Sequence, residues 1–464
     1  MTESLDIPVD GQSKRMTVRE ALELGRRRQD AGDLSGAADI YQQIHTTDPR
    51  QVDALHLLGV ISHRLGELDL AAELIAAALA INPDFADAHS NLGVVFFGQG
   101  RYDEATTSYQ RAIDINSNYA DPHNNMGALH QRLGRLEEAV TSYRKAIAID
   151  PDFADAHNNL ATLLLLLGRF DEGWIEFAWR WKIAQFSSAL KKFDKPLWQG
   201  GNLTGKRILV WEEQGVGESL LFAGLIPELV QQGADVSIDC DPRLAPLFAR
   251  SFPKIDCTGS QDFDFHVPLA DLGRWLRPDA KSFPTGGSYL QADREASAIL
   301  RHRYLENGGD LLVGLAWRSN SPHYSEQKSM TLADLGPVLA IPGITFVNLQ
   351  YGDTAFERAD NNIIDDASVD QMADLDAFAA QVAALDVVVT ISNTTAHLAG
   401  GLGVPTLLML DTIPIWYWQT GRADSPWYPS LQLFRQRRPG DWADVIERVA
   451  EALKSGQFPL RKGI

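Results

Sequence analysis

The chain has 464 residues, of which 45% are hydrophobic and 22% are charged, as is typical of a folded protein of roughly three domains. Its formal net charge of −19 excludes the basic surface of a nucleic-acid-binding protein, so an anionic ligand would need a local cationic pocket. The two cysteines give no disulfide framework, and the sequence contains no apolar run long enough to predict a membrane span. The N-terminus lacks the features of a secretory signal. We therefore expect a cytoplasmic protein.

A repeat with a period of 34 residues fills the N-terminal region. Residues 82–115 read NPDFADAHSNLGVVFFGQGRYDEATTSYQRAIDI, and residues 116–149 repeat the pattern. Glycine, alanine and aromatic positions stay in phase, as expected of helix pairs that cross closely at small residues. The pattern resembles the tetratricopeptide repeat. It predicts an all-α solenoid of five units over 14–183, after a flexible N-terminus at 1–13.

The fifth unit departs from this pattern. Gly173 replaces the in-phase alanine, Arg180 stands where earlier units have alanine, and the tail WIEFAWRWKI is aromatic. An array of repeats needs a capping unit at its end. We therefore expect the fifth unit to pack onto the domain that follows.

Three asparagines recur in phase on the first helices of their pairs, which face the inner surface of the solenoid: Asn91, Asn125 and Asn159. A column of side-chain amides can hold the backbone of an extended peptide, because amides both donate and accept hydrogen bonds. The repeat-fused protein O-GlcNAc transferases, which this region resembles, use such a ladder on their substrates. The alternative is that these amides bond between neighbouring helices.

Residues 184–204 are interpreted as a linker because they contain a proline and a Gly-Gly pair. Beyond them, short apolar strands alternate with helices, which favours parallel, doubly wound sheets. We predict two Rossmann-like lobes, at 205–305 and at 306–464, the second ending in a closing helix. A ligand is expected in the cleft between them, beyond the carboxyl ends of the strands.

The turn GVGES at 215–219 follows the first strand of the first lobe and carries Glu218 at the start of a helix. It matches neither the dinucleotide-binding fingerprint nor the phosphate-binding P-loop. A carboxylate at this position can take a proton from an acceptor hydroxyl as a general base. The alternative is a carboxylate that only compensates the helix dipole.

The segment ISNTTAHLAGGLGVPT at 391–406 predicts a strand, a turn and a helix of small residues. The free amides of the first helical turn, together with Asn393, Thr394 and Thr395, suit a phosphate in an acidic protein. His397 lies one turn further, within reach of a phosphate or a sugar hydroxyl. The alternative for His397 is a structural histidine.

Two cations follow the first strand of the second lobe, Arg318 and Lys328. They can neutralise the charge that develops on a departing phosphate, or they can be solvated loop residues. Aromatic runs at 416–418 and 424–429 either stack on a base or sugar or anchor a docked domain.

Together these motifs resemble the GT-B glycosyltransferases, in particular the heptosyltransferase-like group that is fused to tetratricopeptide repeats in bacteria. The resemblance rests on GVGESLLFAGLIPEL, LLVGLAWRSN, ITFVNLQYGD and LDVVVTISNTTAHLAGGLGVPT. It implies that Glu218 stands where the group has an aspartate as base. It also implies a nucleotide-sugar site that contains Asn393, Thr394, Thr395, His397, Arg318, Lys328 and Gln350.

The resemblance implies a metal-independent protein O-glycosyltransferase, in which the repeats recruit an acceptor such as flagellin and the lobes modify its Ser or Thr. No cofactor is expected besides the nucleotide-sugar donor, for which a CMP-nonulosonic acid is the candidate. No metal is expected, since the two Asp-x-Asp patterns, at 239–241 and 262–264, lie in the first lobe. The alternatives are a transferase acting on a lipid-linked saccharide and a peptide-binding adaptor with degenerate lobes.

Overall fold

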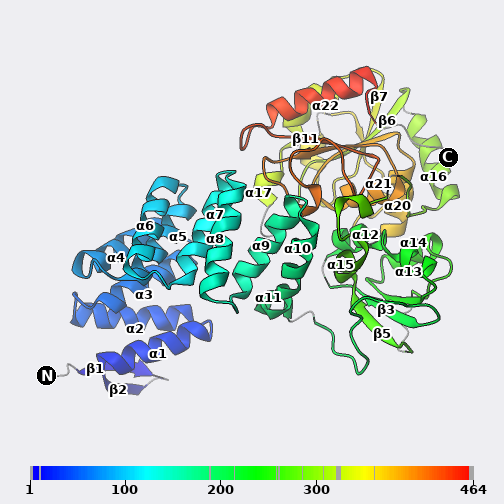
Figure 1. Ribbon diagram of the computed structural model, residues 1–464. Coiled ribbons are helices and arrows are strands. Elements are labelled where there is room, and N and C mark those ends of the chain that lie inside the picture. Colours follow the sequence, from blue (N-terminus) through cyan, green and yellow to red (C-terminus); the bar gives the residue numbers. More distant parts are fainter. Residues whose placement is uncertain are drawn as a thin grey trace. The chain divides into compact units, whose positions relative to one another are not determined.

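The chain divides into two compact units, Met1–Leu160 and Ala161–Ile464 (Figure 1). The boundary falls inside helix α9 (Ala154–Leu166), so most of the fifth repeat lies in the second unit. The sequence predicts that the repeats end at residue 183, which lies inside the second compact unit. The computed structural model describes residues 4–9, 12–187, 190–213, 215–257, 259, 262–284, 286–306, 308–319, 325–359 and 361–458.

The first unit begins with a β-hairpin rather than with the flexible N-terminus expected at 1–13. Strands β1 (Ser4–Val9) and β2 (Gln12–Thr17) pair antiparallel. Alternation along β1 points Leu5 and Ile7 to one face, and both are buried against the first helix pair. The expectation failed because six residues of alternating polarity are a weak strand signal by themselves.

Four helix pairs follow with the predicted period (Figure 1). Gly93 and Gly127 show why glycine recurs at the period of the repeat, because a Cβ atom on Gly93 would lie 2.5 Å from the ring of Tyr109, and one on Gly127 would lie 2.5 Å from the ring of Tyr143. The small residue and the aromatic residue are thus two halves of one contact. The helices are α1 (Val18–Asp30), α2 (Leu34–Thr47), α3 (Val52–Arg64), α4 (Leu68–Ile81), α5 (Ala86–Gly98), α6 (Tyr102–Ile115), α7 (Ala120–Arg132) and α8 (Leu136–Ile149).

The second unit starts with the rest of the fifth pair, α10 (Phe170–Phe177), followed by the 3-10 turn η1 (Ala178–Lys182) and α11 (Ala184–Ser187). Trp174 packs against Gly273, where any side chain would overlap its ring. Its Nε1 donates to the carbonyl of Arg277 at 2.7 Å. The fifth unit therefore packs onto the following domain, as its aromatic tail predicts.

The first sheet has three parallel strands in the order β4-β3-β5: β3 (Arg207–Trp211), β4 (Asp235–Asp239) and β5 (Phe265–Pro268). This small sheet corresponds to the predicted first lobe. Its helical segments are α12 (Val216–Ala223), α13 (Ile226–Gln231), α14 (Ala245–Ser251), η2 (Leu269–Asp271), α15 (Leu272–Leu276), η3 (Ala280–Ser282) and α16 (Arg294–Leu305).

The second sheet has six parallel strands in the order β11-β10-β9-β6-β7-β8. The order reverses between β6 and β9, and ligands of such sheets bind beyond the carboxyl ends of the strands at this point. The strands are β6 (Leu311–Ala316), β7 (Ile344–Asn348), β8 (Ile363–Ile364), β9 (Val387–Ile391), β10 (Thr406–Leu410) and β11 (Leu431–Arg435).

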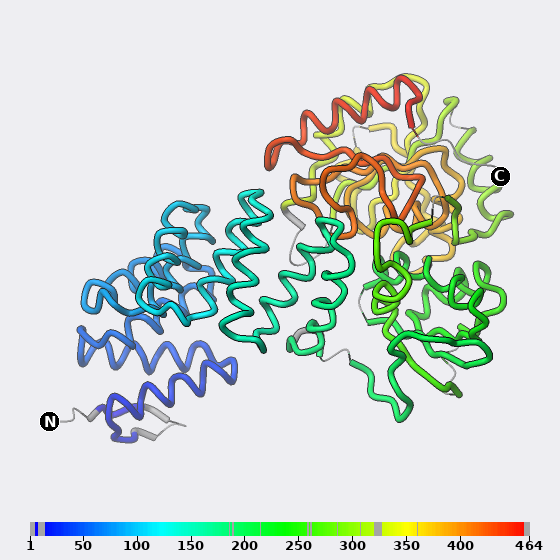
Figure 2. Tube along the Cα trace, in the orientation of Figure 1, coloured from blue at the N-terminus to red at the C-terminus, as the bar shows by residue number. Residues whose placement is uncertain are grey.

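The closing helix α22 (Ala443–Ser455) packs on this sheet, at the red end of the trace in Figure 2. Val445, Ile446, Val449 and Leu453 join the core formed by β6, β9 and β10, as their helical spacing predicts. The other helical segments are α17 (Ser325–Lys328), η4 (Leu332–Leu335), α18 (Gly336–Leu339), α19 (Ala355–Arg358), α20 (Leu375–Ala383), α21 (Thr394–Leu402) and η5 (Trp416–Trp418). None of the helices in the described residues combines the length and the apolar character needed to cross a bilayer.

Candidate functional site

The N-terminal ends of two helices from different sheets meet in the second unit. Helix α12 packs against α21, and a Cβ atom on Gly217 would lie 3.2 Å from Cδ2 of His397 and 3.7 Å from Oγ1 of Thr394. Only glycine permits this approach without displacing the histidine. The structure thus brings Glu218, the residue after Gly217, into the same region as the turn that precedes α21.

Glu218 lies in the first turn of α12 and is partly buried. Burial raises the pKa of its carboxyl to about 7, and the negative charge of Glu213 acts in the same direction. The Glu218 charge in turn raises the pKa of Tyr417 on η5. A carboxyl group that titrates near neutrality is suited to general acid or base chemistry.

A buried ion cluster adjoins Glu218. Nη2 of Arg180 donates to both carboxylate oxygens of Glu213, at 2.9 and 2.8 Å, and to Oδ1 of Asp271 at 2.6 Å. The side chains of Arg180 and Glu213 are only 1% and 3% exposed. Burial raises the pKa of Glu213 to about 7, although Arg180 opposes this rise.

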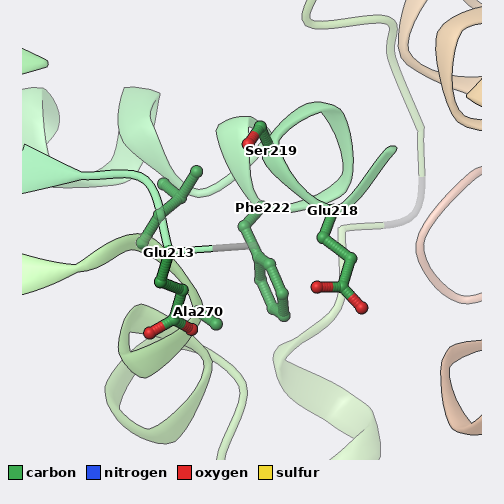
Figure 3. Close-up of a pocket in the computed structure, with 6 residues that line it drawn as sticks. Glu213, Glu218, Ser219, Phe222 and Ala270 are labelled. Atoms are coloured by element: carbon green, nitrogen blue, oxygen red, sulfur yellow. The ribbon is translucent and has the colours of Figure 1, made fainter. Parts of the chain in front are cut away.

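Glu213 and Glu218 line the same small cavity, together with Ser219, Phe222 and Ala270 (Figure 3). Its volume is about 10 Å³, which is about the space of one water molecule. In the view of Figure 3 the ring of Phe222 stands between the two carboxylates. This cavity is too small for a sugar nucleotide in the present conformation.

The turn before α21 contains buried polar groups that lack partners. The Asn393 side chain caps the helix by accepting from the amide of Ala396 at 3.2 Å. Within the described residues, Nδ2 of Asn393 and Oγ1 of Thr395 have no hydrogen-bond partner, and these residues are 7% and 1% exposed. A buried polar group without a partner is costly, so such groups indicate a site that a ligand completes.

His397 lies in an aromatic cage on α21. It stacks on Trp418 with ring centroids 5.1 Å apart, and its Nδ1 lies 2.9 Å from the hydroxyl of Tyr428. Burial lowers the pKa of the imidazole to about 3, and the nearby Lys328 charge adds to the effect. His397 is therefore neutral at physiological pH, and any contact it makes with a ligand is a hydrogen bond rather than an ion pair.

Lys328 is the predicted cation that lies near α21. It is 8% exposed, and burial lowers the pKa of its ammonium group while Asp411 raises it. Among the described residues no salt bridge pairs it. A desolvated ammonium group beside a helix N-terminus attracts an anion.

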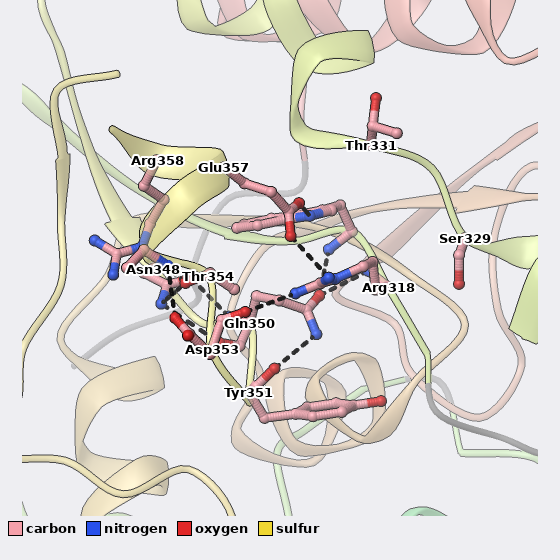
Figure 4. A network of polar contacts seen from close by, with 12 residues as sticks. Arg318, Ser329, Thr331, Asn348, Gln350, Tyr351, Asp353, Thr354, Glu357 and Arg358 are labelled. Carbon is pink, nitrogen blue, oxygen red and sulfur yellow. Dashed lines mark hydrogen bonds and ion pairs between the residues drawn. The ribbon is translucent and has the colours of Figure 1, made fainter. Parts of the chain in front are cut away.

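Arg318 and Gln350 lie in a different network (Figure 4). The guanidinium of Arg318 pairs with Glu357 at 2.7 Å. The Gln350 side-chain oxygen accepts from the amides of Trp317 and Arg318, and its Nε2 donates to the Tyr351 carbonyl. Gln350 thus holds the chain that follows β6, a role that its position at the end of β7 does not reveal.

A polar cavity of about 270 Å³ lies beside this network, at the carboxyl ends of β7 and β8. Its walls include Asn348, Tyr351, Asp365 and Asp370. The cavity lies on the same edge of the sheet as the turn before α21. Within the described residues no group of three or more His, Cys, Asp or Glu side chains could hold a metal ion.

The two aromatic runs are domain anchors rather than exposed stacking platforms. Trp416, Tyr417, Trp418, Trp427 and Tyr428 are all less than 8% exposed. Trp416 packs against residues of the fifth repeat and of the first lobe, namely Trp174, Phe177 and Phe222. Of the two alternatives that the sequence leaves open for these aromatic runs, stacking on a ligand or anchoring a docked domain, the structure favours the anchor.

The predicted asparagine column lies in the helix pairs, and two of its members bond between neighbouring repeats. Nδ2 of Asn91 lies 2.8 Å from Nε2 of His56, and Nδ2 of Asn159 donates to Oδ1 of Asn124 at 3.0 Å. Asn91, Asn125 and Asn159 are all partly exposed. For Asn91 and Asn159 these contacts match the alternative interpretation, in which the amides bond between neighbouring helices. The three side chains remain partly exposed, which leaves room for a ligand.

Sequence reasoning missed Glu213 as part of the site, and it assigned no role to Arg180. The position of Arg180 in the repeat could have indicated its role. Three earlier units have alanine at this position, and an arginine there needs a specific partner. Glu213 has no comparable signal, since it is one of two adjacent glutamates after a strand.

The helical region matches known repeat families. Residues 29–95 match the model described as tetratricopeptide repeat, and residues 96–134 and 132–168 match that described as TPR repeat. The N-terminal region is therefore an all-helical tetratricopeptide-repeat solenoid, a class that binds other proteins through its extended surface.

Among characterised proteins, the chain is similar to Protein FlbA of Caulobacter vibrioides, with 34% identity over 312 residues. The alignment covers 61% of this chain and about half, 52%, of that protein. Among solved structures, MamA is 26% identical and covers 36% of this chain and 98% of its own, with a TM-score of 0.30. A thermophilic TPR protein of Thermus thermophilus is 23% identical and covers 36% of this chain and 92% of its own, with a TM-score of 0.34.

Proposed function

We propose that the second unit is a GT-B glycosyltransferase that transfers a sugar from a nucleotide donor to Ser or Thr of a protein acceptor. The observation that carries the proposal is the meeting of α12 and α21. Through Gly217 it brings the turn that carries Glu218, whose carboxyl pKa is raised to about 7, against a helix N-terminus with unsatisfied buried donors. A group-transfer site needs these two components, a base for the acceptor and an anion site for the leaving group.

The anion site is the turn before α21. The first-turn amides of the helix, Oγ1 of Thr395 and Nδ2 of Asn393 are donors, and Lys328 adds a positive charge. This combination binds a phosphate without a metal ion, in a chain whose net charge is −19. The polar cavity at β7 and β8 lies on the same sheet edge and has room for the nucleoside.

In the proposed reaction Glu218 takes the proton of the acceptor hydroxyl. The acceptor oxygen forms a bond to the anomeric carbon, and the bond from that carbon to the donor phosphate breaks. The nucleotide leaves with both electrons of that bond, and the donors of the turn before α21 stabilise its charge. A CMP-nonulosonic acid is the candidate donor, with CMP as the leaving group.

The repeats are proposed to recruit the acceptor, for which flagellin is the candidate. A solenoid of helix pairs presents an extended surface, and the column of Asn91, Asn125 and Asn159 supplies amides for a peptide backbone. Two of these amides already bond between repeats, so the acceptor would share them with the array.

One observation favours a second candidate, a peptide-binding adaptor with an inactive second unit. The cavity at Glu218 has room for about one water molecule, and the first turns of α12 and α21 are packed closely against each other. An adaptor needs no opening at this place, whereas a transferase must open to admit its substrates.

Intact-mass analysis distinguishes the two candidates. Flagellin is co-expressed with the full-length chain in a host that makes the nucleotide sugar. The glycosyltransferase proposal predicts a mass increment of one or more sugar residues on flagellin. Flagellin that co-purifies with the chain and shows no increment would instead support the adaptor.

Replacing Lys328 with Met is expected to weaken nucleotide binding by about ten-fold or more, because a charged hydrogen bond contributes about 1.5–3 kcal/mol. Isothermal titration calorimetry with CMP measures the change. Lys454→Met, at an exposed position of α22, is the matched control. Equal affinities of the wild type and the Lys328→Met variant would exclude Lys328 from the anion site.

Replacing Asn91, Asn125 and Asn159 together with Ala is expected to weaken acceptor binding by about ten-fold or more, since each lost hydrogen bond contributes about 0.5–1.5 kcal/mol. Surface plasmon resonance with immobilised flagellin measures the affinity. Asn118→Ala, at an exposed turn, is the control. A triple variant that loses thermal stability but keeps its affinity would show that these amides serve the array alone.

A further inference from the structure

The fifth repeat contributes a buried arginine to the region around Glu218. Arg180 comes from η1, directly after the repeat helix α10, and it reaches Glu213 and Asp271 of the first lobe. Its guanidinium also lies over the rings of Phe177 and Trp181, at 4.2 and 4.4 Å from their centroids. Arg180 is therefore fixed by packing on one side and by carboxylates on the other.

Glu213 connects this arginine to Glu218. It receives two hydrogen bonds from Arg180 and lines the same cavity as Glu218. A buried ion pair of this kind contributes little to stability, because the cost of desolvating two charges offsets their attraction. Its position beside a proton-transfer group gives a better reason for an arginine where three earlier repeats have alanine.

We propose that Arg180 is a positioning residue of the proton-transfer site, acting on Glu218 through Glu213, so that the last repeat forms part of that site. The inference rests on the proposed function, because it assigns Glu218 the role of the base. Arg180 orients Glu213 and favours its ionised form against the effect of burial, and the charge of ionised Glu213 adds to the effect of burial in raising the pKa of Glu218.

Within the part of the chain that the structure describes, charged and titratable groups from several segments lie around Glu218. They are Arg180 on η1, Glu213 after β3, Asp271 on η2, His397 on α21 and Tyr417 on η5. His397 and Tyr417 are neutral near pH 7, because burial lowers the pKa of the first and raises that of the second. Glu213 and Arg180 are the charged groups that shift the pKa of Glu218, in opposite directions, and Asp271 shares Arg180 with Glu213.

The test measures the titration of Glu218 directly and by activity. Protein labelled with ¹³C at the glutamate carboxyl groups is titrated by NMR, and Glu218→Gln assigns the signal. Glu213→Gln keeps the shape of the side chain and removes its charge, so we expect the pKa of Glu218 to fall by about one pH unit. The acidic limb of the kcat/KM profile for sugar transfer should move by the same amount.

Arg180 is tested by a pair of variants. Arg180→Lys keeps the charge and should leave both the titration and the pH profile close to those of the wild type. Arg180→Gln should move both to lower pH, because Glu213 without its arginine takes up a proton and the charge with the larger effect on Glu218 is lost. If this variant does not fold, Glu213→Gln alone tests the inference. An unchanged Glu218 titration in Glu213→Gln would overturn the inference. A shifted titration in a chain that transfers no sugar to any acceptor would contradict the proposed function and would still support the coupling of the two carboxyls.

Discussion

Replacing Glu218 with Gln is expected to lower the rate of sugar transfer by about 10²–10⁴-fold, the contribution typical of a general base. Gln has nearly the same shape but cannot take the acceptor proton. In the wild type the rate should rise with pH up to about 7, because only the ionised carboxylate accepts a proton and burial places its pKa near that value. Mass spectrometry of flagellin over a time course measures the rate.

The control for Glu218→Gln is Glu295→Gln, at an exposed position in the first turn of α16, which should transfer sugar at the wild-type rate. Binding of CMP should survive in both variants, because the proposed reaction has Glu218 act on the acceptor rather than on the leaving group. Transfer by Glu218→Gln at the wild-type rate would exclude the carboxylate as the base and leave it the role of compensating the helix dipole.

Replacing Trp174 with Ala is expected to lower the free energy of unfolding of the second unit by about 3–5 kcal/mol, the usual effect of removing a large buried aromatic side chain. Trp174 is 2% exposed, covers Gly273 and donates a hydrogen bond to the Arg277 carbonyl. The variant loses these contacts and leaves a cavity. Urea denaturation followed by circular dichroism measures the change.

Trp179 offers the comparison for Trp174, because it lies five residues further on the same segment and is only partly buried. Trp179→Ala should lower the free energy of unfolding by clearly less than Trp174→Ala does. Equal losses would mean that the fifth repeat contributes aromatic bulk in general rather than one specific contact with the first lobe.

The sequence predicted best those elements whose residue pattern repeats along the chain, which are the helix pairs. The helix pairs follow from residue classes in phase, and the contact of Gly93 with Tyr109 shows why two of those classes occur together. The turn before α21 was also found from its residues, because a strand followed by Asn-Thr-Thr and a small-residue helix has few other interpretations. The close approach of Gly217, the residue before Glu218, to His397 and Thr394 is a long-range contact, and only the structure shows it.

Other features depend on partners far along the chain. Gln350 follows β7 by two residues, where a nucleotide contact was expected, and its side-chain oxygen accepts hydrogen bonds from the amides of Trp317 and Arg318. Arg180 has an unusual identity for its phase, but the sequence does not show that Glu213 and Asp271 lie around it. The hairpin of β1 and β2 was missed because its burial depends on the first helix pair.

Helix α9 runs without interruption through the boundary between the two compact units. A truncated chain that begins after the last repeat, at residue 184 or 205, would lack Trp174 and Arg180. It would expose Gly273 and leave Glu213 and Asp271 without their arginine. Expression designs that separate the repeats from the remainder should therefore cut before α9 begins, at the turn that precedes Ala154, and keep the fifth helix pair with the C-terminal fragment.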